Sequence, residues 1–120
     1  MWRARSFLVL VLAVPLLSAE SQAVVDTDSV ADVRCFMVAM QIGKTPGTTQ
    51  QTAALTGAMY YLGRLDGRSP KLDLESVMVA EAAKMTPADL RSEAVRCGAT
   101  ITARGNEIQR IGKDLIERGK

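Results

Sequence analysis

Two cysteines carry the most defined chemistry in this chain. Cys35 and Cys97 are the only cysteines among 120 residues, and they lie far apart in the sequence. No Cys-x-x-Cys pair occurs, so a thioredoxin-like redox role has no support. In a small exported protein, two cysteines of one domain commonly form a disulfide. We therefore predict a Cys35–Cys97 bond, with two free buried thiols as the alternative.

A second group of chemically versatile residues lies in the stretch GAMYYLGRLDGRSP, residues 57–70. Tyrosine and arginine are enriched at the residues that dominate protein–protein binding energy. The stretch therefore contains a candidate protein contact made of Tyr60, Tyr61, Arg64 and Arg68.

The alternative interpretation of this stretch is a helix end. Gly67 suits a left-handed C-terminal cap, because glycine has no side-chain penalty there. Arg64 faces the negative end of the helix dipole, and Asp66 has Arg64 or Arg68 as candidate ion-pair partners. Tyr61 falls on the apolar face of the helix, where its hydroxyl would need a hydrogen-bond partner if buried.

Residues for the common catalytic chemistries are missing. The chain has no histidine, which excludes Ser-His-Asp and Cys-His arrangements and any zinc site containing histidine. No glycine-rich phosphate loop is present, and Glu75 and Glu81 lie six residues apart, on different faces of a helix. We interpret these scattered acids as a solvated surface. The sequence predicts a protein that is not an enzyme and uses no cofactor and no metal.

The N-terminus predicts export. Two arginines precede the apolar block FLVLVLAVPLL, and small and polar residues follow it. This order is typical of a secretory signal peptide, so we expect residues 1–23 to be a signal peptide. Ser21-Gln22-Ala23 fits the cleavage pattern best, with cleavage after Ala19 as the alternative. Residues 24–120 would then form one helical domain in the periplasm or outside the cell, with no membrane contact.

Charge limits the partners of that domain. The chain has 15 basic and 13 acidic side chains, and removal of Arg3, Arg5 and Glu20 leaves them nearly balanced. A nucleic-acid-binding protein would show a basic excess, so we exclude nucleic acid. The remaining candidates are a protein partner, an unfolded client or a second copy of the chain in a homodimer.

Four helical segments position these residues. Residues Asp26, Thr27 and Asp28 favour a helix start, and Gly43 favours its end. A Thr48–Gln51 capping box predicts a second helix to about Asp66, with a buried stripe of Ala54, Ala58, Tyr61 and Leu65. A third helix begins at Ser69 or at Asp73, and Thr86-Pro87-Ala88-Asp89 begins a fourth that continues to the chain end. No strand pattern appears. We expect an all-α fold: a small four-helix bundle with a long C-terminal helix and one disulfide.

Three glycines recur at a seven-residue interval in the last helix. They are Gly98, Gly105 and Gly112, and each costs a helix up to about 1 kcal/mol relative to alanine. One interpretation is a helix of low intrinsic stability. The other is a groove in which another helix backbone or a partner comes close.

The order of these features resembles the HdeA-type acid-stress chaperones of the bacterial periplasm. The matching elements are Cys35, the helix end from Gly57 to Arg64, the segment Leu72-Asp73-Leu74 and Cys97. Small helical periplasmic immunity proteins share a similar outline. The resemblance implies a helical, singly disulfide-bonded, non-enzymatic periplasmic protein.

Two functional hypotheses follow. The first is a stress-related or chaperone-like binder, in which acid protonates the carboxylates and charge repulsion exposes methionines for adaptable contacts. The methionines are Met37, Met40, Met59, Met78 and Met85. The second is a specific protein-binding module, such as an immunity protein or a subunit of an envelope complex.

Overall fold

The computed structural model describes residues 24–120, and the predicted signal peptide lies outside them. This part of the chain is all-helical, as expected, with no strand among its residues. Its four helices are α1 (Thr27–Ile42), α2 (Thr49–Arg68), α3 (Leu74–Ala82) and α4 (Pro87–Arg118).

The ends of α1 follow the sequence prediction. The Asp26 carboxylate accepts a hydrogen bond from the Ser29 backbone N–H at 2.9 Å, and the Gly43 N–H donates to the Ala39 carbonyl at 2.9 Å. These bonds satisfy backbone groups that a helix end otherwise leaves free. Gly43 also lies close to α2, because a Cβ placed on it would meet the Ala54 Cβ at 3.3 Å.

At the start of α2 the predicted capping box is half correct. The Gln51 N–H donates to the Thr48 hydroxyl at 3.0 Å, as predicted, but the Gln51 side chain accepts from the Gly47 N–H at 2.8 Å instead of from Thr48. Gly47 has a φ of 74°, the one positive φ among residues 24–120. This turn brings the Gly47 N–H, rather than that of Thr48, within reach of the glutamine.

The predicted end of α2 is wrong. The helix continues through Gly67 to Arg68, and Ser69 is its cap, with its N–H donating to the Leu65 carbonyl at 2.7 Å. The two extra residues place Arg68 where its guanidinium reaches Asp32 on α1 at 2.9 Å. This long-range ion pair stabilises the last residues of α2, and the helix therefore continues beyond Gly67.

The starts of α3 and α4 are both set by side-chain caps. Of the two candidates for α3, Asp73 is the cap, and its carboxylate accepts from the Ser76 N–H at 3.1 Å. At α4 the predicted Thr86 cap with Pro87 in the first turn is confirmed. Thr86 and Asp89 form a reciprocal capping box, in which the Thr86 N–H donates to the Asp89 carboxylate at 2.8 Å.

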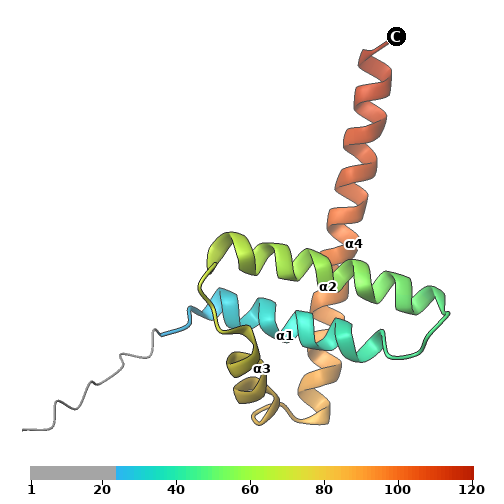
Figure 1. The fold of residues 1–120 in the computed structure, drawn as a ribbon. Coiled ribbons are helices and arrows are strands. Elements are labelled where there is room, and N and C mark those ends of the chain that lie inside the picture. Colours follow the sequence, from blue (N-terminus) through green and yellow to red (C-terminus); the bar gives the residue numbers. More distant parts are fainter. Residues whose placement is uncertain (1–23) are drawn as a thin grey trace, which may run out of the picture.

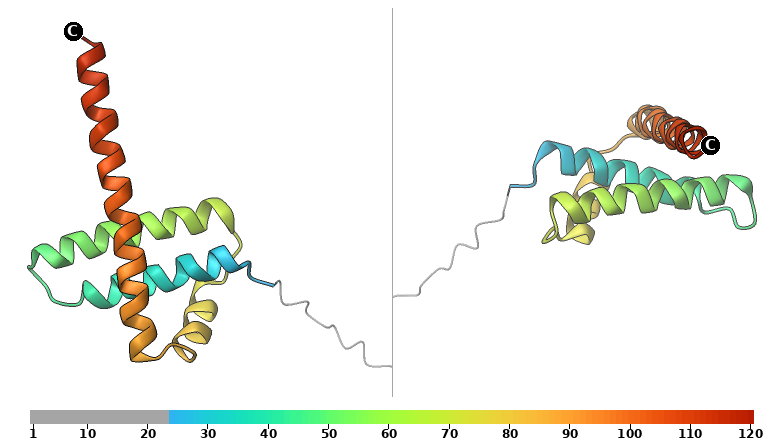
Figure 2. Two further views of the ribbon diagram at one scale, coloured as in Figure 1. Left: turned by 180° about the vertical axis from the view of Figure 1, so that it is seen from behind. Right: turned by 90° about the horizontal axis from the view of Figure 1, so that it is seen from above.

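α1 lies at the centre and packs against each of the other three helices. α1 and α2 run side by side as an antiparallel pair, and α3 packs near the start of α1 (Figure 1). α4 crosses one face of the α1–α2 pair, and only its first half lies on that face (Figure 2). The second half, drawn in red, extends away from the other helices. We call α1, α2, α3 and residues 87–101 the body, and residues 102–118 the arm.

The core of the body is small and centres on the helix crossing. Tyr61, Cys35 and Cys97 form its buried cluster, and Phe36, Tyr60 and Ile101 pack against it. The predicted stripe of α2 is confirmed as buried: Ala54, Ala58, Tyr61 and Leu65. None of the helices between residues 24 and 120 is long and apolar enough to cross a bilayer.

Candidate functional site

The two cysteines meet where α4 crosses α1. Their Sγ atoms are 2.01 Å apart and their Cα atoms 5.4 Å apart, which is disulfide distance, as predicted. This bond connects residues separated by 62 positions and fixes the base of α4 to the centre of the body. Because the sulfurs bond to each other, neither can act as a nucleophile or a thiolate ligand.

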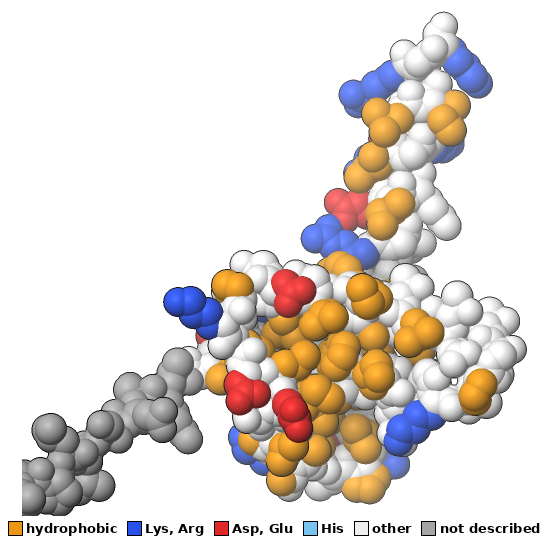
Figure 3. Space-filling view, viewed as in Figure 1, with side chains coloured by type: hydrophobic (Ala, Val, Ile, Leu, Met, Phe, Trp, Pro, Cys, Tyr) orange, Lys and Arg blue, Asp and Glu red, His pale blue; other side chains and the backbone are white. Residues whose placement is uncertain are grey.

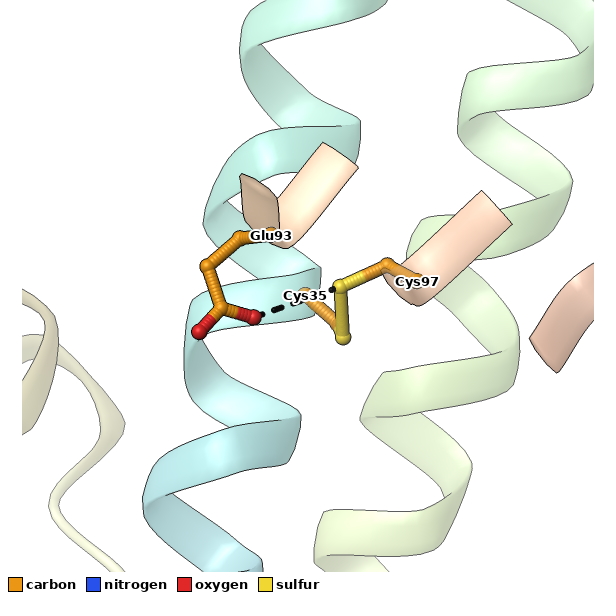
Figure 4. A group of neighbouring side chains, drawn as sticks. All are labelled: Cys35, Glu93 and Cys97. Carbon is orange, nitrogen blue, oxygen red and sulfur yellow. Dashed lines mark hydrogen bonds between the residues drawn. A yellow bond between two sulfur atoms is a disulfide. The ribbon is translucent and has the colours of Figure 1, made fainter. Parts of the chain in front are cut away.

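Glu93 lies beside this bond, one turn before Cys97 on α4 (Figure 4). Its carboxylate is 3.9 Å from the Cys97 sulfur, and the three possible ligand atoms of Cys35, Glu93 and Cys97 lie within 4.8 Å of one another. In the disulfide state only the carboxylate of this group remains as a metal ligand. That carboxylate already pairs with Arg96 at 2.5 Å. We therefore interpret Cys35, Glu93 and Cys97 as structural residues that stabilise the crossing of α4 with α1.

Tyr61 connects α2 to the same point. It is 2% exposed, and its hydroxyl donates to the Cys97 carbonyl at 3.0 Å, which supplies the partner that the sequence required. Burial raises the pKa of this phenol above its ordinary value. Tyr60 packs against it, with ring centroids 5.1 Å apart in an edge-to-face arrangement.

The two arginines of the predicted contact both turn inward. Arg64 Nε lies 3.0 Å and Arg68 Nη1 lies 2.9 Å from the same carboxylate oxygen of Asp32, which is 3% exposed. Asp66, the partner expected from the sequence, takes neither arginine. Arg64 also donates to the Tyr60 hydroxyl at 3.2 Å, and this bond is the main reason that the pKa of Tyr60 is lowered.

The structure therefore brings Tyr60, Tyr61, Arg64 and Asp32 together at the interface of α1 with α2. Their polar groups bond within the chain. A further contact of Tyr60, Tyr61, Arg64 and Arg68 with another protein stays a prediction.

A second buried carboxylate connects α3 to α1. Glu81 is 4% exposed, accepts two hydrogen bonds from Arg34 at 2.9 and 2.7 Å, and pairs with Lys84 at 2.7 Å. Its pKa is lowered, first by the Lys84 hydrogen bond and, against the opposing effect of burial, by Arg34. Our interpretation of Glu81 as a solvated acid is wrong. Its spacing of seven from Leu74 and four from Val77, on the apolar side of α3, was the signal available in the sequence.

The arm presents a different kind of surface. Four aliphatic side chains there stay open to solvent: Ile108 is 69% exposed, Ile111 43%, Leu115 63% and Ile116 66%. Figure 3 shows hydrophobic side chains at intervals along the projecting helix, and a broader group over the body. Ile108 and Leu115 continue the face on which Cys97 and Ile101 pack against the body. We call Ile108, Ile111, Leu115 and Ile116 the arm stripe.

The glycines of α4 have no packing reason inside the chain. A Cβ placed on Gly98, Gly105 or Gly112 would meet no atom within 4 Å. Gly57 of α2 is different, because a Cβ there would lie 3.8 Å from Ile101 at the helix crossing. The glycine of α2 therefore lies in contact with α4 at the helix crossing, and Gly105 and Gly112 of the arm lie open beside the arm stripe.

A groove lies at the base of the arm. It has a volume of about 280 Å³, is lined mainly by apolar and small side chains, and lies between α4 and the adjoining ends of α1 and α2. On the α4 side it is bounded by Ala94, Cys97, Gly98, Ile101 and Thr102. The groove thus runs along the packed part of α4 and reaches the first residue of the arm, Thr102.

Comparison with known proteins assigns no family to this chain. No protein-family model matches it, and no curated protein or solved structure does. The resemblance to HdeA-type chaperones stays a prediction, and the candidate site depends on the geometry of residues 24–120.

Proposed function

We propose that this protein is an exported, non-enzymatic module that binds protein through the arm. In this proposal residues 24–120 form a small helical bundle that the disulfide cross-links. The body of this bundle holds the arm out into the solvent. Periplasmic or secreted location follows from the predicted signal peptide and from a disulfide that an oxidising compartment favours.

One observation carries the proposal. The apolar face of α4 is packed against the body only as far as Ile101, and beyond it Ile108, Leu115 and Ile116 are about two-thirds exposed. An amphipathic helix normally derives most of its stability from packing of its apolar face. In the arm this apolar face continues uncovered, on a helix that is anchored rigidly at its base. Proteins commonly bind one another when such a helix lays its exposed apolar face into a groove of the partner.

Paired serine substitutions in the arm stripe test this proposal. We expect Ile108→Ser with Leu115→Ser to weaken binding by at least about tenfold, since burial of each aliphatic side chain contributes about 1.5–3 kcal/mol. The measurement is cross-linking of the tagged protein in cells, followed by mass spectrometry of everything attached, its own copies included.

The matched control is Val79→Ser, which removes an equally exposed aliphatic side chain, 67% open, from α3. This variant should keep the cross-linked species of the unmodified protein. The proposal fails if the arm variant and the control give the same cross-linked species in the same amounts.

A specific feature of the body favours acid-triggered, chaperone-like binding as a second candidate. Asp32 and Glu81 are buried carboxylates at the contacts of α1. Asp32 holds α1 to α2 through two arginines, whereas Glu81 holds α3 to α1 through Arg34 and also pairs with its own neighbour Lys84. Because the pKa of Glu81 is lowered on folding, its stabilising contribution is complete above the ordinary value of 4.5 and is lost as pH falls below it. Acid would therefore loosen the contact between α3 and α1.

Substitution at Glu81 tests this acid response. We expect Glu81→Gln to lower the free energy of unfolding at neutral pH and to make it fall less steeply between about pH 7 and pH 3. Glu75→Gln, which alters an exposed acid of the same helix, should behave like the unmodified protein. The chaperone-like function itself requires dye binding and protection of an aggregating client to rise in acid. A flat response from about pH 7 to pH 2 rules it out.

A further inference from the structure

We infer that the partner of the arm is the arm of a second copy of this chain, packed antiparallel to the first. This inference rests on the proposed function and names the partner of the same surface. It is carried by the repeat in the sequence of α4, the absence of neighbours around two of its glycines, and the distribution of charge on the arm.

The repeat is a glycine followed three residues later by an aliphatic residue, three times in succession. The pairs are Gly98 with Ile101, Gly105 with Ile108, and Gly112 with Leu115. A seven-residue period keeps these positions on one face of a helix that supercoils with a partner. The body uses only the aliphatic member of the first pair, since Ile101 packs at Gly57 of α2. In the second and third pairs the glycines meet no atom within 4 Å, and Ile108 and Leu115 are about two-thirds exposed.

Alternation of glycine with a large side chain favours antiparallel pairing. In a parallel pair, glycine would face glycine at one level and isoleucine would face isoleucine at the next. The first level needs a short distance between the helices and the second a long one, so no single separation fits both. In an antiparallel pair each glycine faces an aliphatic side chain, and every layer has the same width. The absent side chain of Gly105 or Gly112 then leaves space for the leucine or isoleucine of the other copy.

The body determines how far the two arms overlap. α2 crosses α4 at Ile101, so the tip of a second arm on this face can extend only to about that point. One register covers the exposed part of the arm beyond Ile101. It pairs Gly105 with Leu115 and Gly112 with Ile108 of the other copy. Ile111 then meets Ile111 on the two-fold axis. Ile116 points toward Thr102 of the other copy, at the edge of the apolar groove. All four exposed side chains of the arm stripe are covered.

Charge on the arm does not oppose this arrangement. Arg104 pairs with Glu107, Arg110 with Asp114 at 2.9 Å, and Lys113 with Glu117 at 3.9 Å. Three of the four basic side chains of the arm are thus paired with an acid of the same arm, which leaves Arg118 and keeps the charge low on a surface that meets its own copy. Arg104 and Arg118 approach each other between copies in this register, and Glu107 offsets that repulsion. Each copy contributes only one helix, so we expect a contact smaller than the roughly 800 Å² per partner of stable complexes and a dimer that dissociates on dilution.

Symmetric cross-linking tests the register. Ile111→Cys places two cysteines on the two-fold axis, and mild oxidation of the purified protein should connect them into a covalent dimer. Arg110→Cys, at the same height on the opposite side of the arm, should give much less. Peptide mapping checks that Cys35 and Cys97 stay paired with each other. Equal cross-linking at the two positions would overturn the antiparallel pairing.

Sedimentation across a concentration series tests the dimer itself. We expect the unmodified protein to approach dimer mass as concentration rises. Gly105→Leu with Gly112→Leu should raise the dissociation constant by at least about tenfold, because the added side chains fill the space for the other copy. Gly63→Leu is the matched control, since a Cβ at Gly63 also meets nothing within 4 Å. It should dimerise normally, and circular dichroism verifies that all variants are helical.

A protein that stays monomeric at every concentration overturns the inference. The same holds if the doubly substituted protein dimerises as well as the Gly63→Leu control. Neither result removes the proposed function. The protein could be monomeric and still cross-link in cells to a different protein. If Ile108→Ser with Leu115→Ser abolishes that cross-link, the partner of the arm is a helix of another protein.

Discussion

Asp32 shows what a single residue contributes to this fold. Its carboxylate is buried on α1 and receives one arginine from each of two successive turns of α2. A buried carboxylate is tolerated because it is paired and hydrogen-bonded, and removal of such an acceptor leaves its donors without a partner. Because Arg64 and Arg68 are each about one-third exposed, water can partly replace the lost acceptor.

Substitution of Asp32 tests this role. We expect Asp32→Ala to lower the free energy of unfolding by roughly 1.5–3 kcal/mol, the range for hydrogen bonds to charged groups. Urea denaturation at neutral pH measures the change. Asp66→Ala removes an exposed carboxylate from α2 and should alter stability by less than about 0.5 kcal/mol. Equal effects of the two substitutions would contradict the assigned role of Asp32.

Sequence reasoning reached some of these residues and missed others for a physical reason. The need of Tyr61 for a hydroxyl partner was predictable, because periodicity alone places it on the buried face of α2. Asp32 and Glu81 were not identified, because their burial depends on arginines from other helices. An acid on an apolar face is therefore ambiguous until the tertiary arrangement is known.

At the scale of elements, α4 combines two different halves. Its start is fixed locally by the Thr86–Asp89 capping box and Pro87, and these signals were readable in the sequence. Its first half gains stability from the body, whereas the arm has only its own backbone and three ion pairs. Isolated helices of this length are marginal in water, and two internal glycines weaken this one further.

Alanine substitution of the arm glycines tests this account of the arm. At a protein concentration where the chain is monomeric, we expect Gly105→Ala with Gly112→Ala to increase helix content. The reason is that each change favours the helix by up to about 1 kcal/mol and meets no neighbour. Circular dichroism measures the increase. Ala103→Gly should produce the opposite change, and a decrease on alanine substitution would show that the glycines already pack against something.

The existence of four helices followed from caps and periodicity, but their arrangement did not. The sequence predicted a disulfide between the first and last helices, and this is found. It did not predict that α4 crosses the α1–α2 pair so that half of it projects, because a crossing angle is set by the side chains that meet. Here Ile101 of α4 packs at Gly57 of α2, and no rule of local sequence selects that contact.

For the whole molecule, the disulfide holds the arm in place. It connects residues 62 positions apart in a body with a small core. The chain-entropy relation gives about 4 kcal/mol for a loop of this size. That is a large share of the roughly 5–15 kcal/mol that stabilises a typical domain.

Reduction of the disulfide tests this dependence. We expect a reductant to lower the free energy of unfolding by about 4 kcal/mol and to reduce helix content throughout the body. Urea denaturation with and without reductant gives the value, and mass spectrometry after alkylation counts the thiols released. An unchanged unfolding curve for fully alkylated protein would show that packing alone holds α4 on α1.

Hydrogen exchange along α4 shows whether the arm is a contact surface that the body holds out to a partner. The account predicts fast exchange of the amides of residues 105–116 in dilute protein, and slower exchange of the same amides at high concentration or with a bound partner. Amides of residues 94–101, beside the disulfide, should be protected in every condition. Arm amides that exchange at one rate in all of these conditions would contradict the account.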